Sequence, residues 1–229
     1  VIYNKSLEKI ISNKNTLIDI NDSHLISGEG IIYLRSKFTI LSNQPTIIKD
    51  KFNNQIKLNG FNYFVKSKIL KTKQMELIDN QSNIYKSNNA MIDLSNKKIA
   101  AKDIQIYFAE GELGKDARLK GSSLISENNI STIKNGIFTA CKIRDKCPPW
   151  SLKSKEIKHD KEKQTVNYKD SWLQLYDIPI LYFPKFFHPD PTVKRQSGFL
   201  VPSIINSSTN GASINIPYYN VISENKDYT

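Results

Sequence analysis

The sequence predicts an all-β protein built from stacked, repeated units. Short runs in which apolar and polar residues alternate fill most of the first 140 residues, and a period of two is typical of a half-buried strand. Turn-forming residues separate these runs at intervals of roughly 8 to 12 residues, which is typical of a sandwich, a jelly roll or a solenoid. The runs are also degenerate copies of one another.

The strand-like runs share one apolar face. They include Gly30–Leu41, Phe61–Leu70, Gln74–Asp79 and Lys102–Phe108. The apolar face contains eight candidate interior residues: Tyr63, Val65, Met75, Leu77, Ile92, Leu94, Ile104 and Ile106. An ordinary closed core explains this face as well as a trough that is open along one side and able to hold acyl chains. The alternation alone does not separate the two.

An internal repeat favours stacking of these runs. The segment Ala90–Phe108 aligns with Phe61–Asp79 and with Ile157–Leu175, and the pair Lys102-Asp103 aligns with Lys169-Asp170. The first 20 residues resemble a further unit. Units that cannot bury their own apolar face are expected to stack on one another.

The charge is strongly basic, with 33 Lys and Arg against 22 Asp and Glu and a net charge of +11. A drift toward AT-rich codons explains the abundance of lysine, asparagine and isoleucine; an anionic lipid or glycolipid partner is the alternative. A nucleic-acid groove usually contains more arginine. No run reaches the roughly 18 apolar residues of a membrane-spanning helix. Val1 and Thr229 lie in strand-like runs, so we expect a segment of a longer chain.

Catalytic and metal-binding motifs are not found, so we expect no enzyme activity, no metal and no cofactor. At His159-Asp160, a turn stabilised by the aspartate is favoured over a catalytic dyad. Cys141 and Cys147 are spaced too widely for a typical zinc pair. In an exported protein they favour a disulfide over free thiols. Whether they join each other or other cysteines stays open.

Prolines are concentrated in the segment from Leu181 to Ser203, which contains four of the nine. Because proline donates no backbone hydrogen bond, we interpret residues 176–197 as a rigid connector. Beyond Gly198, two strand-like runs separated by Ser207–Asn210 predict a hairpin. Such runs fit tilted strands of a transmembrane barrel, or a soluble sheet.

The stretches "CPPWSLKSKEIKHD", "IPILYFPKFFHPDPTVKRQSGFLVPS" and "IPYYNVISENKDYT" resemble the LptD family of lipopolysaccharide-assembly proteins, with "RQSGFLVPS" and "PYYN" the most telling. The resemblance implies three parts: a periplasmic OstA-type twisted β-jellyroll at 1–175, a proline-rich hinge at 176–197, and the first strands of an outer-membrane β-barrel at 198–229. It also implies that lipid A acyl chains travel through the jellyroll to a laterally opening barrel. Implied partners are lipopolysaccharide, an LptA-type bridge protein, an LptE-type lipoprotein and the outer membrane, with the chain mostly on the periplasmic side and no nucleic acid.

The same resemblance assigns roles to residues. The eight interior residues would contact acyl chains, and Pro202 and Pro217 would weaken the barrel seam as a lateral gate. A local disulfide between Cys141 and Cys147 is favoured, with a link to distant barrel cysteines as the alternative. A stand-alone bridge or lipid-binding module is the second interpretation. A basic nucleic-acid-binding β-protein, with Tyr107 and Phe108 stacking on bases, is the third.

Overall fold

The computed structural model describes residues 1–20, 24–109, 116–142, 149–189, 197–200, 203–207, 211–223 and 226–229. In these residues the chain forms strands and no helix. The strands are β1 (Ile2–Asn4), β2 (Lys9–Ser12), β3 (Thr16–Ile20), β4 (His24–Gly28), β5 (Ile31–Leu34), β6 (Thr39–Asp50), β7 (Gln55–Phe64), β8 (Ile69–Ile78), β9 (Ile84–Asp93), β10 (Lys98–Tyr107), β11 (Arg118–Glu127), β12 (Ile130–Thr139), β13 (Trp150–Asp160), β14 (Thr165–Leu175), β15 (Ile178–Pro189), β16 (Gly198–Phe199), β17 (Ser203–Ser207), β18 (Gly211–Asn215), β19 (Tyr218–Ser223) and β20 (Lys226–Tyr228).

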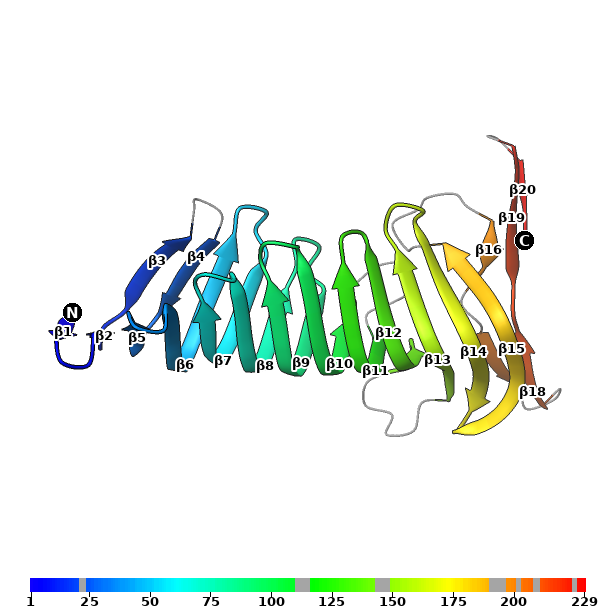
Figure 1. Ribbon diagram of the computed structural model, residues 1–229. Coiled ribbons are helices and arrows are strands. Elements are labelled where there is room, and N and C mark those ends of the chain that lie inside the picture. Colours follow the sequence, from blue (N-terminus) through cyan, green and yellow to red (C-terminus); the bar gives the residue numbers. More distant parts are fainter. Residues whose placement is uncertain are drawn as a thin grey trace.

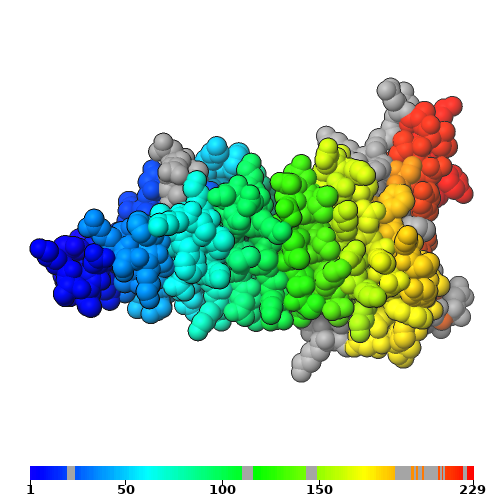
Figure 2. All heavy atoms as spheres, in the orientation of Figure 1, coloured from blue at the N-terminus to red at the C-terminus, as the bar shows by residue number. Residues whose placement is uncertain are grey.

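One antiparallel sheet of 15 strands organises the molecule. From β5 to β15 every strand pairs with its neighbours in sequence, while β3 and β4 form a branch that joins the sheet at β6. The molecule is therefore elongated, with the N-terminal strands at one end and the C-terminal strands at the other (Figure 1). In the space-filling view, successive segments follow one another along the long axis (Figure 2). The all-β architecture and the stacking of hairpin units agree with the sequence prediction.

The long strands bend sharply at their midpoints. Residues in the middle of five of them have a positive φ, between 49° and 78°: Gly60, Asn89, Asp103, Asn135 and Asp170. Glycine, asparagine and aspartate adopt this left-handed conformation at the lowest cost. The ladder skips a residue at the bends, passing for example from the pair Ser154–Ser171 to the pair Glu156–Lys169. We call the line of these bends the crease.

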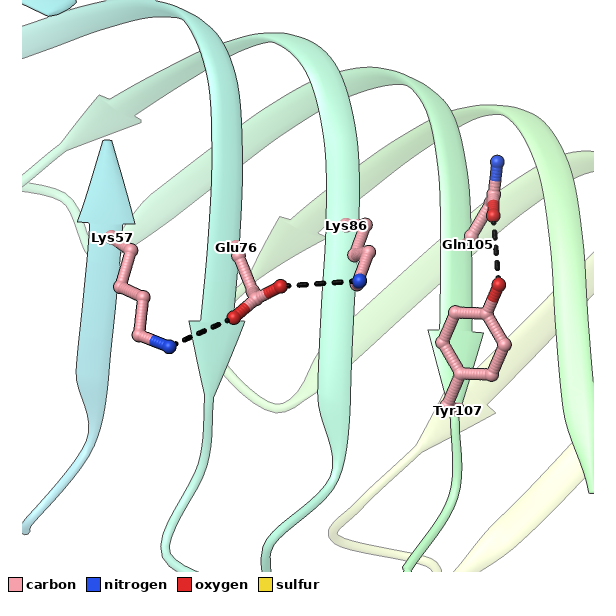
Figure 3. A network of polar contacts seen from close by, with 5 residues as sticks. All are labelled: Lys57, Glu76, Lys86, Gln105 and Tyr107. Carbon is pink, nitrogen blue, oxygen red and sulfur yellow. Dashed lines mark hydrogen bonds and ion pairs between the residues drawn. The ribbon is translucent and has the colours of Figure 1, made fainter. Parts of the chain in front are cut away.

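The crease divides the sheet into two facing walls, and the ribbon can be followed from one wall around into the other (Figure 3). Wall A contains residues 55–59, 74–78, 84–88, 103–107 and their equivalents in β11 to β15. Wall B contains residues 61–64, 69–72, 90–93, 98–102 and their equivalents. This V-shaped arrangement is a twisted β-jellyroll, as predicted.

Small residues allow the two walls to approach each other at the crease. A Cβ atom added at Gly121 would lie 2.3 Å from Cγ2 of Ile133, and one added at Gly136 would lie 2.4 Å from Cδ1 of Ile157. Carbon atoms in contact normally lie about 3.5–4.0 Å apart. Glycine at these two positions is therefore a packing requirement.

The structure corrects the connector predicted at residues 176–197. Residues 178–189 form β15, which pairs with β14 along its length, so the jellyroll sheet continues to Pro189. Pro184 lies at the crease, where the ladder passes from Lys169–Lys185 to Ser171–Phe183, and Pro179 lies beside a register shift. Proline is tolerated at such irregularities and in the last strand of a sheet. Residues 190–196 lie outside the described residues.

The C-terminal strands pair with one another, as expected for the predicted hairpin. β17 pairs with β18 and β16 with β19, and the N–H group of Leu200 donates to the carbonyl oxygen of Pro217 at 2.9 Å. Pro217 lies in the break between β18 and β19, not inside a strand as the sequence suggested. In the described part of the chain, no helix is long and apolar enough to cross a membrane.

Candidate functional site

The space between the two walls is lined by apolar side chains along the length of the sheet. Five of the eight residues predicted to face inward are buried there, with exposed fractions of 1–6%: Tyr63, Met75, Ile92, Ile104 and Ile106. Val65 and Leu94 are partly buried and pack against this core, and Leu77 is half-buried. The alternation pattern therefore placed the inward face in the correct register at these positions.

Burial decreases from the crease toward the hairpin turns. Ile104, next to the crease, is 1% exposed, Ile106 is 6% exposed, and Phe108 at the turn is half-buried. On the facing wall, Tyr63 is buried and Val65 at the turn is partly exposed. The interior is thus closed at the crease, and its apolar surface reaches solvent along the line of the turns. We call this line the mouth.

The polar groups beside the crease are satisfied locally. Thr72 donates to the carbonyl oxygen of Gly60 at 2.7 Å, and the hydroxyl of Ser171 donates to that of Ser154 at 2.8 Å. Among the described residues, the hydroxyl of Ser87 is the buried side-chain group without a hydrogen-bond partner. Since the inward-facing side chains beside the crease are apolar or hydroxyl-bearing, the interior suits hydrocarbon and excludes charge.

An aromatic cluster lies at the C-terminal end of the interior. The rings of Tyr168 and Phe186 are stacked with centroids 4.4 Å apart, and Phe183 packs beside Phe186 at 5.3 Å. The Tyr168 hydroxyl lies 2.9 Å from Nε2 of His188, and burial raises the pKa of this phenol far above its usual value. Ile216, from the C-terminal strands, also packs against the core. The sequence analysis missed this cluster because the bend at Pro184 changes the side-chain alternation.

The outer face of wall A is polar, and its carboxylate Glu76 is paired with two lysines. Glu76 accepts hydrogen bonds from Lys57 and Lys86 at 3.1 and 3.2 Å, and these bonds lower the pKa of its carboxyl group (Figure 3). Beside them, the Tyr107 hydroxyl donates to Gln105 at 3.0 Å. The surrounding depression has a volume of 460 Å³. Its central carboxylate is already paired, and Gln105 faces away from the interior.

Other residues singled out from the sequence occupy structural positions. Asp160 accepts a hydrogen bond from the N–H group of Lys163 at 3.0 Å and stabilises the turn, as predicted. Phe108 packs against the core and contacts Phe138 in an edge-to-face arrangement with centroids 6.3 Å apart, so its ring contributes to packing. In the described part of the chain, no group of three or more His, Cys, Asp or Glu side chains is placed to hold a metal ion.

The remaining predicted residues fall at the edges of the described structure. Cys141 is half-buried, with its Sγ 3.6 Å from the carbonyl oxygen of Trp150, and is a free thiol here. Cys147 and Pro202 lie outside the described residues.

Comparison with curated proteins relates the whole arrangement to one family. An LPS-assembly protein LptD of Shewanella denitrificans is 28% identical over 207 residues, which cover 82% of this chain and 26% of that protein. The LptD of Yersinia pestis is 35% identical over 46% of this chain and 13% of its own length. The chain is thus similar to LptD proteins over most of its length. A third LptD, from Escherichia coli, is 29% identical over 66% of this chain and 20% of its own length.

The LptD-type similarity includes the sheet. A match to 82% of the chain is more than the residues after Cys141 can supply, so it extends over much of the jellyroll. The chain nevertheless spans only about a quarter, or less, of the length of these relatives. No family model matches the sequence.

Proposed function

We propose that this chain transports lipopolysaccharide to the outer leaflet of the outer membrane by carrying its acyl chains between the two walls of the jellyroll. The observation that supports this most directly is the apolar interior, which continues from the N-terminal strands to Phe186 and is accessible along the mouth. The relatives are named for LPS assembly, which agrees with such cargo. Their names describe assembly proteins, and we propose no catalytic step.

The interior has the properties that movement of a lipid requires. Its residues beside the crease are apolar or bear hydroxyls, of which that of Ser87 is buried without a hydrogen-bond partner, so acyl chains leave water without meeting a charge. Stacking of similar units gives a similar surface at each step along the axis. The interior therefore offers the acyl chains no single site that binds them much more tightly than the neighbouring positions. The eight interior residues of the sequence analysis are proposed to contact the acyl chains.

The domain roles follow from the same proposal. Residues 1–175, continued by β15, form the periplasmic carrier, and the connector between carrier and barrel is shortened to about residues 190–197. The strands from Gly198 onward are proposed to begin an outer-membrane barrel. Pro202 would then remove a ladder donor near its seam, and Pro217, in the break between β18 and β19, would keep the ladder interrupted there; both would help the seam open sideways.

Two protein partners are proposed. An LptA-type bridge protein would deliver the lipid at the N-terminal end, where β3 is an edge strand that pairs only with β4 and Leu17 is 65% exposed. Such an edge can accept a strand from another sheet. An LptE-type lipoprotein would plug the barrel. The chain would lie mostly on the periplasmic side of the outer membrane. A disulfide from Cys141 to Cys147 is proposed to form after export.

Site-specific photocrosslinking tests the proposal. Probes at Ile104 and Ile106 should crosslink to lipopolysaccharide in low and high salt, and a probe at Gln105 is the outward-facing control. Removal of the acyl chains from the lipid should abolish the inward crosslinks. If all three positions stay silent in folded protein, the interior is a closed core and the transport proposal fails. Crosslinks that vanish in high salt would instead indicate an electrostatic surface contact.

A further inference from the structure

The turns that close the hairpins of wall B form a recurring basic feature along one side of the mouth. Five turns of four residues recur there, at 5–8, 35–38, 65–68, 94–97 and 161–164. The fourth residue of each has a positive φ, between 46° and 54°. Each turn carries at least one exposed lysine: Lys5, Lys37, Lys68, Lys97 and Lys163. We call these five turns the wall B rim.

Backbone hydrogen bonds connect neighbouring turns of this rim. In three successive steps, the first residue of one turn donates its N–H group to the carbonyl oxygen of the last residue of the preceding turn. The bonds run from Arg35 to Glu8 at 3.0 Å, from Val65 to Phe38 at 2.9 Å and from Leu94 to Lys68 at 3.1 Å. Because the turns 5–8, 35–38, 65–68 and 94–97 follow one another two strands apart, they lie about 9.5 Å from one another. The turn 161–164 lies four strands beyond 94–97, about 19 Å away, because the β11–β12 turn at 128–129, which has no lysine, lies between them. The N–H group of Lys161 donates to the carbonyl oxygen of Asn129 at 2.8 Å and continues the same pattern. The lysines therefore form a row along the mouth.

The rim lysines are available to an external anion. The ion pairs of the described residues involve Lys57, Lys86, Lys98 and Lys134 and none of the rim lysines. The turns 5–8 and 161–164 also contain the exposed carboxylates Glu8 and Glu162, so the lysine charge is least opposed in the turns 35–38, 65–68 and 94–97. Two further carboxylates bond to the backbone of their own turns. Asp93 accepts hydrogen bonds from the N–H groups of Ser95 and Asn96, and Asp160 accepts one from that of Lys163.

The opposite rim has a different character. The turns of wall A at 51–54 and 80–83 follow Asp50 and Asp79, and each carboxylate accepts hydrogen bonds from the backbone of its own turn. Asparagine side chains complete both turns. These two described turns of wall A contain one lysine, Lys51, whereas each of the five four-residue turns of wall B contains at least one.

We propose that the wall B rim binds the phosphate groups of an anionic lipid while its acyl chains lie between the walls. This inference rests on the proposed function and adds a site for the headgroup. The position is suitable because Val65 and Leu94, in two of the rim turns, pack against the interior while lysines of the same turns are exposed to solvent. Acyl chains held inside would place a headgroup beside these lysines.

The choice of lysine suits a headgroup that moves. The lysine ammonium group is a strongly hydrated point charge, whereas arginine holds phosphate in a fixed bidentate geometry. Exposed ion pairs are individually weak, and along the first four turns equivalent charges about 9.5 Å apart allow one contact to form before another is lost. The rim therefore orients the lipid without trapping it.

A charge-matched pair of variants in the full chain tests the site. The rim variant carries Lys37→Gln, Lys68→Gln, Lys97→Gln and Lys163→Gln. Glutamine fits the fourth turn position, since Gln164 occupies it with a φ of 51°. The control variant carries Lys102→Gln, Lys120→Gln, Lys153→Gln and Lys155→Gln, four exposed lysines on the outer faces of the walls. Both lose the same charge.

Binding is measured with bis-phosphorylated lipopolysaccharide and with its enzymatically dephosphorylated form, at low salt, together with crosslinking from Ile104. We expect the rim variant to bind the phosphorylated lipid about tenfold more weakly, the sum of four weak exposed contacts. The control variant should bind as the native chain does, and the dephosphorylated lipid should not distinguish the three. The Ile104 crosslink should persist in all of them.

Each other outcome overturns a specific statement. Equal weakening in rim and control variants would mean a general charge effect, and no weakening would mean that the rim does not contact the headgroup. Competition by inorganic phosphate beyond that of chloride at equal ionic strength, together with equal binding of the phosphorylated and dephosphorylated lipids, would assign the rim to the free ion instead of the lipid. Loss of the Ile104 crosslink in the native chain would refute the proposed function itself.

Discussion

Substituting Gly121 by alanine places a methyl group in the tightest contact of the crease. The added Cβ would lie 2.3 Å from Cγ2 of Ile133, and 3.2 Å from both Cγ2 of Ile104 and the carbonyl oxygen of Lys134. To restore an ordinary carbon–carbon distance, Ile133 must move by about 1.2–1.7 Å. Overpacking of this kind costs about 1–3 kcal/mol. No release of backbone strain offsets the cost, since the φ of Gly121 is not positive.

Urea unfolding, followed by tryptophan fluorescence, measures this cost, because Trp150 is 8% exposed in the folded state and Trp172 is 43% exposed. With an m value of about 2 kcal/mol/M, the midpoint should fall by about 0.5–1.5 M. Ile133→Leu removes the clashing Cγ2 atom at constant volume, so the double variant should lose less stability than the two single variants together. Lys120→Ala, at the adjacent exposed position, should change stability by less than about 0.5 kcal/mol. Simple additivity of the two crease substitutions would refute the assigned contact.

Three further substitutions test the outer network, the aromatic cluster and the proline position. Hydrogen bonds from its lysine partners lower the pKa of Glu76, so this ion pair stabilises the fold at pH values above the ordinary glutamate range, and that stabilisation is lost as the pH falls through the lowered pKa. The plots of Tm against pH for the native chain and for Glu76→Gln should therefore converge in acid. Parallel plots would contradict the pairing. Tyr168→Phe removes the hydroxyl bonded to His188 and should lower the free energy of unfolding by about 0.5–1.5 kcal/mol, whereas an unchanged urea midpoint would show that the bond contributes nothing. Pro184→Ala should change stability by less than about 1 kcal/mol, because the ladder makes no pair at that residue, and a larger loss in thermal melts would show that the ring holds the bend.

The sequence predicted the strands and their inward face because alternation is a local signal. The apolar set containing Tyr63 and Ile104 follows directly from a period of two. The bend at the midpoint of each strand was missed, although its signal was present in the aligned pairs Lys102-Asp103 and Lys169-Asp170. Aspartate in the middle of a β-branched run is a marker of a residue in the left-handed conformation. The alignment of the repeats alone identified this position only as a polar residue between two strand-like runs.

The role of the C-terminal prolines could not be derived from sequence. Proline is disfavoured in a regular central ladder because it donates no backbone hydrogen bond. On this rule, residues 176–197 were predicted to lie outside the sheet. Pro184 is accommodated because it falls at a crease position, and Pro179 because it falls beside a register shift in the last strand. Both conditions depend on how β15 lies against β14, which no local pattern specifies. The aromatic cluster around Tyr168 was missed for the same reason.

Pairing between sequence neighbours has a consequence for the length of the molecule. A strand of the jellyroll finds its partner within the next few dozen residues, so contacts are local and ordering can spread from either end of the array. Addition or removal of one pair of strands changes the long axis by about 9.5 Å and leaves the remaining pairs intact. The length of such a molecule can therefore change in evolution by whole pairs of strands, until it matches the distance that the molecule has to span.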